Sequence, residues 1–320
     1  MGFPVPHEKR FEARKTGVLV HSLAGEGQVV SVYPRAVNIR CGHGLLVSVI
    51  EQAEHMTALS LHVPSYFRSQ GAQLQTGARV RFEKDGLSFD GFSMGIHQDT
   101  PWEAPLAPRD VRGFSRSRTA IFRELLFQQG KRGGLLGLMR PGDAQNLFVQ
   151  KAAGILRRSF QHTPDGARIN GLSQLVGLGP GLTPSGDDFI AGLLLGEKIL
   201  SLLPTPQEAL ESSLRGSRMA PLIPWKINKG ELWRGLTRTN DGGRTLLYQT
   251  LLGYFPNYLI SVAKNLGKAQ AMGDMAGAVR RAVSHGETSG TDALVGLWFY
   301  LNASANAYEY ARIRGEKRTP

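Results

Sequence analysis

A nine-residue pattern that occurs twice constrains the fold of this chain more than any other feature. The pattern is Ser-Gly-x-Asp-x-x-x-Gly-Leu, and it covers residues 185–193 and 289–297. Each copy leads into an apolar run of helical length, so each marks the start of a buried helix. The repetition predicts two related helical units in the C-terminal half, with the two copies close to a pseudo-twofold axis.

The serine and aspartate of each copy have a purely structural explanation. Ser-x-x-Asp ahead of an apolar run is a capping box with Asp in place of Glu. Ser185 and Ser289 can accept a hydrogen bond from a first-turn N–H, and Asp188 and Asp292 suit the positive end of the helix dipole. On this reading alone, the two stretches are well-capped helices and nothing more.

The glycines of the pattern need a further reason. In a helix interior Gly is less favourable than Ala by about 1 kcal/mol. Because Gly lets a backbone or a ligand approach closely, Gly192 and Gly296 predict a helix–helix contact. Gly186 and Gly290 predict an open first turn that a ligand can reach.

The polar groups at these two helix starts favour a ligand site. Hydroxyls beside an open helix N-terminus bind anions, whereas Asp187, Asp188 and Asp292 repel a phosphate unless a cation or a substrate N–H lies between. The set therefore fits a ligand with an anionic end and an amide end. It would equally suit Mg²⁺ with a phosphate, so the sequence leaves a metal open. The glycine spacing of 181–186 is that of a P-loop, but Asp187 and Asp188 stand where Lys and Ser or Thr are required, which excludes that motif.

Local patterns predict an α+β chain with three parts: a β-rich domain of the small barrel or sandwich type at 1–95, a linker at 96–112 and a mostly helical domain at 113–320. Asp85-Gly86 marks a hairpin. Short Val- and Ile-rich stretches predict strands at 17–22, 27–33, 36–41, 44–50 and 59–63. Apolar residues at helical spacing predict helices at 117–130, 144–160, 206–216, 244–266 and 274–286.

Composition limits the cellular compartments and the classes of partner that fit this chain. The net charge of +12 attracts an anionic partner, but the basic clusters are not interleaved with aromatics, so a nucleic-acid partner is disfavoured. The single cysteine, Cys41, fits a reducing compartment. The longest apolar stretch is too short to span a bilayer and no signal peptide opens the chain, so we expect a cytoplasmic protein with no membrane partner.

The segments GLGPGLTPSGDDFIAGLL and GETSGTD resemble the hallmark segments of the AllH family, and AVNIRCGHGLLVSV resembles its N-terminal β region. Members of that family include a subunit of oxamate carbamoyltransferase, which works with other subunits in anaerobic allantoin degradation. The resemblance implies a transferase: a carbamoyltransferase subunit of purine nitrogen catabolism. Such an enzyme exchanges oxalurate and phosphate with oxamate and carbamoyl phosphate. Thr245 stands where the family usually has Ser.

The resemblance carries over to the motif residues, whose roles we infer from their chemistry. Asp188 and Asp292 are predicted to be catalytic, as acceptors for an amide nitrogen. The predicted substrate-binding residues are Thr183, Ser185, Gly186, Asp187, Ser289 and Gly290. Candidates for neutralising a phosphate, by proximity in sequence, are Lys226, Arg234, Arg238 and Arg244. The alternative function is a non-catalytic anion-binding or assembly subunit of a multi-subunit enzyme.

Overall fold

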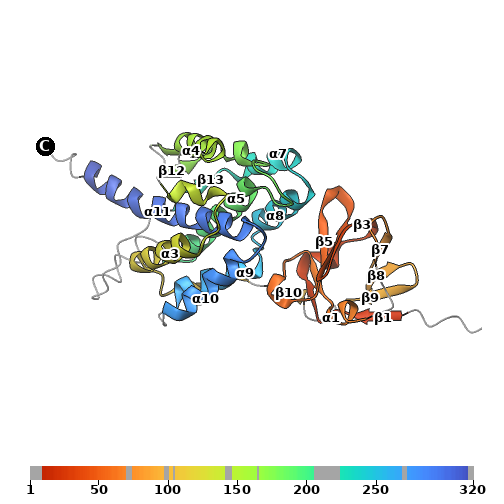
Figure 1. Ribbon diagram of the computed structural model, residues 1–320. Coiled ribbons are helices and arrows are strands. Elements are labelled where there is room, and N and C mark those ends of the chain that lie inside the picture. The colour runs from red at the N-terminus through yellow and green to blue at the C-terminus, as the bar shows by residue number, and fades with distance from the viewer. Residues whose placement is uncertain are drawn as a thin grey trace, which may run out of the picture. The chain divides into compact units, whose positions relative to one another are not determined.

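Figure 1 shows the computed structural model of the chain, which describes residues 9–69, 74–96, 101–103, 105–140, 146–163, 166–204, 224–268 and 272–315. The chain divides into two compact units, Met1–Ala104 and Pro105–Pro320. Strands dominate the first unit and helices the second, which confirms the expected α+β class.

The N-terminal unit is one curled, ten-stranded sheet of the half-barrel type. Its strand order is β1-β9-β8-β7-β3-β4-β5-β6-β2-β10. The strands are β1 (Lys9–Glu12), β2 (Lys15–Gly17), β3 (Gly25–Tyr33), β4 (Ala36–Arg40), β5 (Leu46–Ile50), β6 (Ser60–His62), β7 (Arg79–Glu83), β8 (Gly86–Phe89), β9 (Phe92–Gly95) and β10 (Pro101–Trp102). Three short 3-10 helices, η1 (Val18–Ser22), η2 (Gly42–Gly44) and η3 (Ala53–His55), and the short helix α1 (Pro64–Phe67) connect them.

Most of the expected strands are present, and one is not. The hairpin forms between β7 and β8, but Glu83 pairs with Gly86, so its turn is Lys84-Asp85 rather than Asp85-Gly86. The strand predicted at 17–22 is wrong, because these residues form the 3-10 helix η1, in which Val20 alone is buried. A short Val- and Leu-rich run fits either conformation, since five residues are too few for periodicity to distinguish them.

The C-terminal unit consists of helices with one small three-stranded sheet. Its longer helices are α3 (Arg116–Gln129), α4 (Leu147–Ser159), α5 (Ser185–Ser201), α8 (Asp241–Leu251), α9 (Asn257–Gly267), α10 (Met272–Val283) and α11 (Ser289–Gly315). Shorter helical segments are α2 (Pro108–Val111), η4 (Leu135–Met139), η6 (Leu172–Leu175), α7 (Lys229–Gly235) and η7 (Leu236–Arg238). The sheet holds β11 (Phe160–Thr163), β12 (Gly166–Ile169) and β13 (Lys226–Ile227).

Helix boundaries follow the local signals. Ser115 and Asn146 cap α3 and α4 by accepting hydrogen bonds from first-turn N–H groups. The helical stretch predicted at 244–266 is two helices, α8 and α9, because Pro256 begins a new helix after a turn with Gly253 at positive φ. The stretch predicted at 206–216 lies outside the described residues. The region predicted as a linker, 96–112, holds β10 and α2.

The core of the C-terminal unit forms around α5 and α11. Residues 185–196 of α5 are all buried, and so are residues 290–297 of α11. Helix α5 packs against the N-terminal half of α11, and α11 then continues past it toward the C-terminus (Figure 1). Tyr300 of α11 anchors the small sheet, because its buried hydroxyl donates a 2.7 Å hydrogen bond to the carbonyl oxygen of Trp225.

Candidate functional site

The two copies of the repeated pattern meet at the N-terminal ends of α5 and α11. A methyl group on Gly192 would overlap the carbonyl oxygen of Ala293, and one on Gly296 would overlap that of Phe189. The predicted helix–helix contact at both glycines is confirmed. Farther along, a side chain on Gly196 would overlap the Tyr300 ring, and at the start the Thr183 and Ser289 hydroxyls form a 2.8 Å hydrogen bond, so the two helices run parallel. Because both helices start at the same place, the positive ends of their dipoles converge there.

The open first turn expected at the earlier glycines is wrong. A methyl group on Gly186 would overlap the carbonyl oxygen of Leu175, and one on Gly290 would overlap that of Ala282. The two glycine N–H groups also have partners, since Gly186 donates to Leu178 at 2.8 Å and Gly290 to His285 at 3.1 Å. These glycines admit a neighbouring backbone of the same unit.

The capping explanation of the serines is also wrong. Pro184 precedes α5 as its N-cap, and its carbonyl oxygen accepts from the N–H groups of Asp187 and Asp188. Ser185 is the first residue of the helix and makes no capping hydrogen bond. In α11 the carbonyl oxygen of Thr288 likewise accepts from the N–H of Asp292, which makes Ser289 the first residue there too. Both serine hydroxyls are thus free from helix capping.

Each serine instead faces the aspartate of the other copy. The Ser185 hydroxyl acts on Asp292 and lowers its pKa, and the Ser289 hydroxyl does the same to Asp188. The threonine upstream of each copy acts on the aspartate of its own copy, Thr183 on Asp188 and Thr288 on Asp292. A 2.8 Å hydrogen bond between the hydroxyls of Thr183 and Ser289 joins the two copies directly. The predicted pseudo-twofold arrangement therefore extends to the polar groups.

Asp292 is fully buried and only partly satisfied. Its Oδ1 accepts a 2.6 Å hydrogen bond from the N–H of Leu135, whereas Oδ2 has no partner among the described residues. Gly134 is needed beside it, since any side chain there would overlap the carboxylate. Burial raises the pKa of Asp292 from 3.8 to about 6, against the lowering effect of its hydrogen bonds.

Asp188 has still fewer partners. Its side chain is almost wholly buried, and neither carboxylate oxygen has a hydrogen-bond partner among the described residues. The hydroxyls of Ser289 and Thr183 are near enough to affect its pKa but do not meet hydrogen-bond geometry. Burial, and next the charge of Asp292, hold the pKa of Asp188 well above 3.8. Because buried polar atoms are normally paired, the two free oxygens mark a place for a polar group of a ligand.

Asp187, by contrast, is fully engaged within the protein. Its Oδ1 accepts from the N–H of Gly177 at 2.9 Å, and its Oδ2 accepts from the Thr239 hydroxyl at 2.5 Å. Burial raises the pKa of Asp187 to about 6 although both hydrogen bonds lower it. The Asp187 carboxyl thus links the segment after η6 to the segment after η7 by one hydrogen bond to each.

Several residues at the site carry no local signal in the sequence. Tyr258 of α9 lies close enough to Asp188 for its charge to raise the tyrosine pKa further, after burial as the main cause. The Tyr258 ring stacks on that of His285, with ring centroids 4.3 Å apart. Thr239 and Leu135 also contribute from distant parts of the chain. Only the fold brings these groups together, because no short-range spacing links them to either motif.

The basic residues named by sequence proximity are dispersed. Lys226 lies in β13 and Arg234 in α7, both exposed. The Arg244 guanidinium donates hydrogen bonds to the carbonyl oxygens of Leu236 and Thr239, at 3.2 and 3.3 Å, and so stabilises the backbone around η7. Arg238 is exposed at the end of η7, directly before Thr239. The structure therefore brings none of the four into a hydrogen bond or ion pair with the repeated aspartates in the part of the chain that it describes.

Among the described residues, no group of three or more His, Cys, Asp or Glu could hold a metal ion. In the part of the chain that the structure describes, none of the helices is both long enough and apolar enough to cross a membrane.

The family model described as oxamate carbamoyltransferase subunit AllH matches residues 175–301. The matched range begins in η6 and ends within α11, so it contains both copies of the repeated pattern and the segments that hold Asp187. The resemblance inferred from the motifs is thereby confirmed over this range. No solved structure matches the chain.

Proposed function

We propose that this chain is the subunit of an oxamate carbamoyltransferase that binds the carbamoyl substrate between the N-termini of α5 and α11. The observation that carries the proposal is Asp188, buried with both carboxylate oxygens unpaired, beside Asp292 with one unpaired. A buried carboxyl group without partners is costly, so its presence at a doubled motif indicates a ligand that supplies the missing hydrogen bonds. The family match supports the reaction.

Carbamoyl transfer requires acceptors for the carbamoyl NH₂ and donors for oxygens that gain charge, and these groups can provide both. In the forward direction the amide nitrogen of oxamate bonds to the carbamoyl carbon, the bond from that carbon to the phosphate oxygen breaks, and the nitrogen loses a proton. The unpaired oxygens of Asp188 and Asp292 can accept from the carbamoyl NH₂. The hydroxyls of Thr183, Ser185 and Ser289 can donate to oxygens that gain negative charge. The converging helix dipoles favour the same charge.

The proton of the attacking nitrogen needs an acceptor within reach. A pKa of about 6 leaves Asp292 mostly ionised at neutral pH and yet basic enough to accept a proton. The Asp292 charge also raises the pKa of Asp188, since two close carboxylates resist ionising together. We therefore assign proton acceptance to Asp292 and amide orientation to Asp188. In this account Asp187 is a positioning residue, because both of its oxygens are occupied.

The test is carbamoyl-transfer activity of the assembled enzyme with Ser185→Ala or Ser289→Ala in this chain. Each variant removes one hydroxyl from the site and no helix cap, so we expect kcat/KM to fall about tenfold or more. The loss of the hydrogen bond between Ser289 and Thr183 should lower stability by no more than about 1–3 kcal/mol, so both variants should remain folded. Ser201→Ala, at the exposed end of α5, is the matched control and should leave activity unchanged. Wild-type activity in both motif variants would refute the site. The non-catalytic alternative would then stand, because an assembly subunit needs no hydroxyl at these positions.

A further inference from the structure

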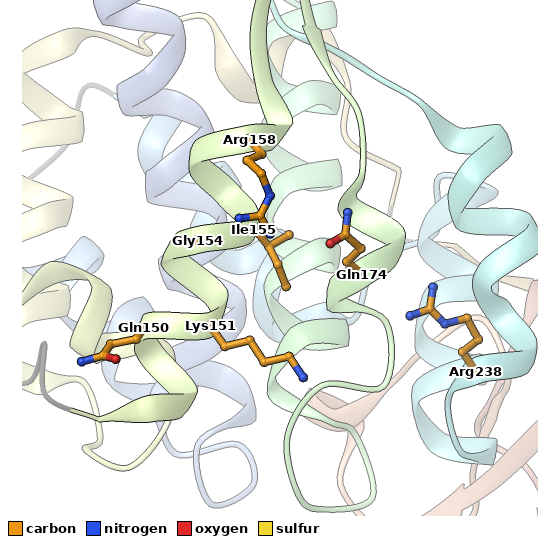
Figure 2. Close-up of a pocket in the computed structure, with 7 residues that line it drawn as sticks. All are labelled: Gln150, Lys151, Gly154, Ile155, Arg158, Gln174 and Arg238. Atoms are coloured by element: carbon orange, nitrogen blue, oxygen red, sulfur yellow. The ribbon is translucent and has the colours of Figure 1, made fainter.

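A second feature of the C-terminal unit is a basic hollow of about 480 Å³. It lies between α4, η6 and the end of η7, and Figure 2 shows its lining residues. Three cations and two amides provide its polar groups: Lys151, Arg158, Arg238, Gln150 and Gln174. Among the described residues that line it there is no carboxylate.

The charges reach the hollow from both sides. Lys151 and Arg158 come from α4, and Arg238 comes from the opposite wall, with its guanidinium directed back toward α4 (Figure 2). Within the described residues neither Lys151 nor Arg238 forms an ion pair. The buried side chain of Ile155 lies between these groups on the α4 side. Cations held around a concave surface attract an anion more strongly than the same cations scattered on a convex surface.

The chemistry of this set favours a phosphoryl group. Arginine presents a planar fork of donors that matches phosphate oxygens in pairs, and lysine adds a compact charge with rotatable donors. The side-chain amides of Gln174 and Gln150 can donate as well. A volume of about 480 Å³ lies in the range of small-molecule sites and exceeds the needs of a bare ion.

Two walls of the hollow are hydrogen-bonded to Asp187, which together with Asp188 and Asp292 forms what we call the aspartate cluster. Gln174 belongs to η6, and Gly177, shortly after that segment, donates to Asp187. Arg238 ends η7, and the next residue, Thr239, donates to the other oxygen of Asp187. One buried carboxyl thus fixes the spacing between two walls of the hollow.

We propose that this basic hollow is a binding site for a small phosphorylated ligand, with inorganic phosphate as its simplest member. The proposal does not depend on carbamoyl transfer at the aspartate cluster, because it assigns a separate set of residues to a separate ligand group. If the proposed function also holds, the phosphate of that reaction is one such ligand.

The test is calorimetric titration of inorganic phosphate into the full chain, in a low-salt buffer without other oxyanions. Wild type should bind phosphate, and Lys151→Gln and Arg238→Gln should each weaken the Kd about tenfold or more. Arg157→Gln is the matched control: it removes an exposed cation from the same helix, next to Arg158, without altering the lining. The control should keep the wild-type Kd, and circular dichroism should show that every variant is folded.

Two further titrations extend the test. One asks whether phosphate binds at this site or at the aspartate cluster, and the other asks whether the site prefers phosphate to another dianion. Asp292→Asn should leave phosphate binding unchanged. If Asp292→Asn abolishes binding while Arg238→Gln preserves it, phosphate binds at the aspartate cluster and the inference is overturned, but the proposed function is not. Tighter binding of oxalate than of phosphate would overturn the assignment to phosphoryl groups. The absence of phosphate binding to wild type up to about 20 mM would overturn the site itself.

Discussion

The burial of Asp292 predicts a pH-dependent stability that its replacement removes. The folded-state pKa of about 6 lies above the ordinary value of 3.8, because burial penalises the charged form. A difference of this size corresponds to about 3 kcal/mol, at 1.36 kcal/mol per pKa unit. This is the free energy by which the folded chain favours protonation of Asp292 more than the unfolded chain does.

The sign follows from which state releases its proton first. As pH rises above about 4, the unfolded chain loses the Asp292 proton while the folded chain retains it, so unfolding becomes more favourable. The contribution is fully present below the unfolded pKa of 3.8 and is lost by the time pH passes the folded value of about 6. Between about pH 4 and pH 7, Asp292 alone should therefore lower the free energy of unfolding by about 3 kcal/mol.

Asp292→Asn removes this contribution, and it also removes the charge that helps to raise the pKa of Asp188, which flattens the pH dependence further. The amide oxygen can still accept from the N–H of Leu135, so the variant preserves that contact while it removes the titration. The free energy of unfolding can be measured at several pH values by urea unfolding followed by circular dichroism. Between about pH 4 and pH 7 it should fall by about 3 kcal/mol less in the variant than in wild type. Asp274→Asn, at an exposed position of α10, should reproduce the wild-type slope. Equal slopes for Asp292→Asn and wild type would contradict the burial argument.

Two further predictions concern packing and positioning. Gly296→Ala should destabilise the chain by about 1–3 kcal/mol or more, because its methyl group meets the backbone of α5. Gly273→Ala, where the space is open, should change stability by no more than about 1 kcal/mol; equal effects in urea unfolding would contradict the close approach of α5 and α11. Thr239→Val should cost about 1–3 kcal/mol, because it leaves a buried oxygen of Asp187 without its donor, and a wild-type denaturation midpoint would show that this hydrogen bond contributes nothing.

The sequence predicted the features that depend on local chemistry. Alternating apolar residues between turn signals defined most strands of the N-terminal sheet, and helical spacing placed the starts of α3 and α4 at 117 and 144, within a few residues of the observed Arg116 and Leu147. The glycines at 192 and 296 predicted a helix contact because a missing side chain has few explanations within a buried helix. The repetition itself predicted that the two copies would meet.

Features that depend on distant partners could not be read from the sequence. The serines look like helix caps, yet Pro184 takes the cap position in α5 and leaves Ser185 to face Asp292. The difference arises from tertiary structure, since only the parallel packing of α5 and α11 brings each serine to the other aspartate. Tyr258 and Thr239 were missed for the same reason. Nothing in their own neighbourhoods indicates that they approach a carboxyl.

The measurement that tests the central claim most directly is the affinity of the chain for carbamoyl phosphate in Ser185→Ala and Ser289→Ala, with Ser201→Ala as control. The two motif serines occupy equivalent positions, because Ser185 faces Asp292 and Ser289 faces Asp188. The account predicts that both substitutions weaken binding by similar factors of about ten or more, while the control binds as wild type does. Unchanged affinity in both motif variants would contradict a ligand site between the two helix starts.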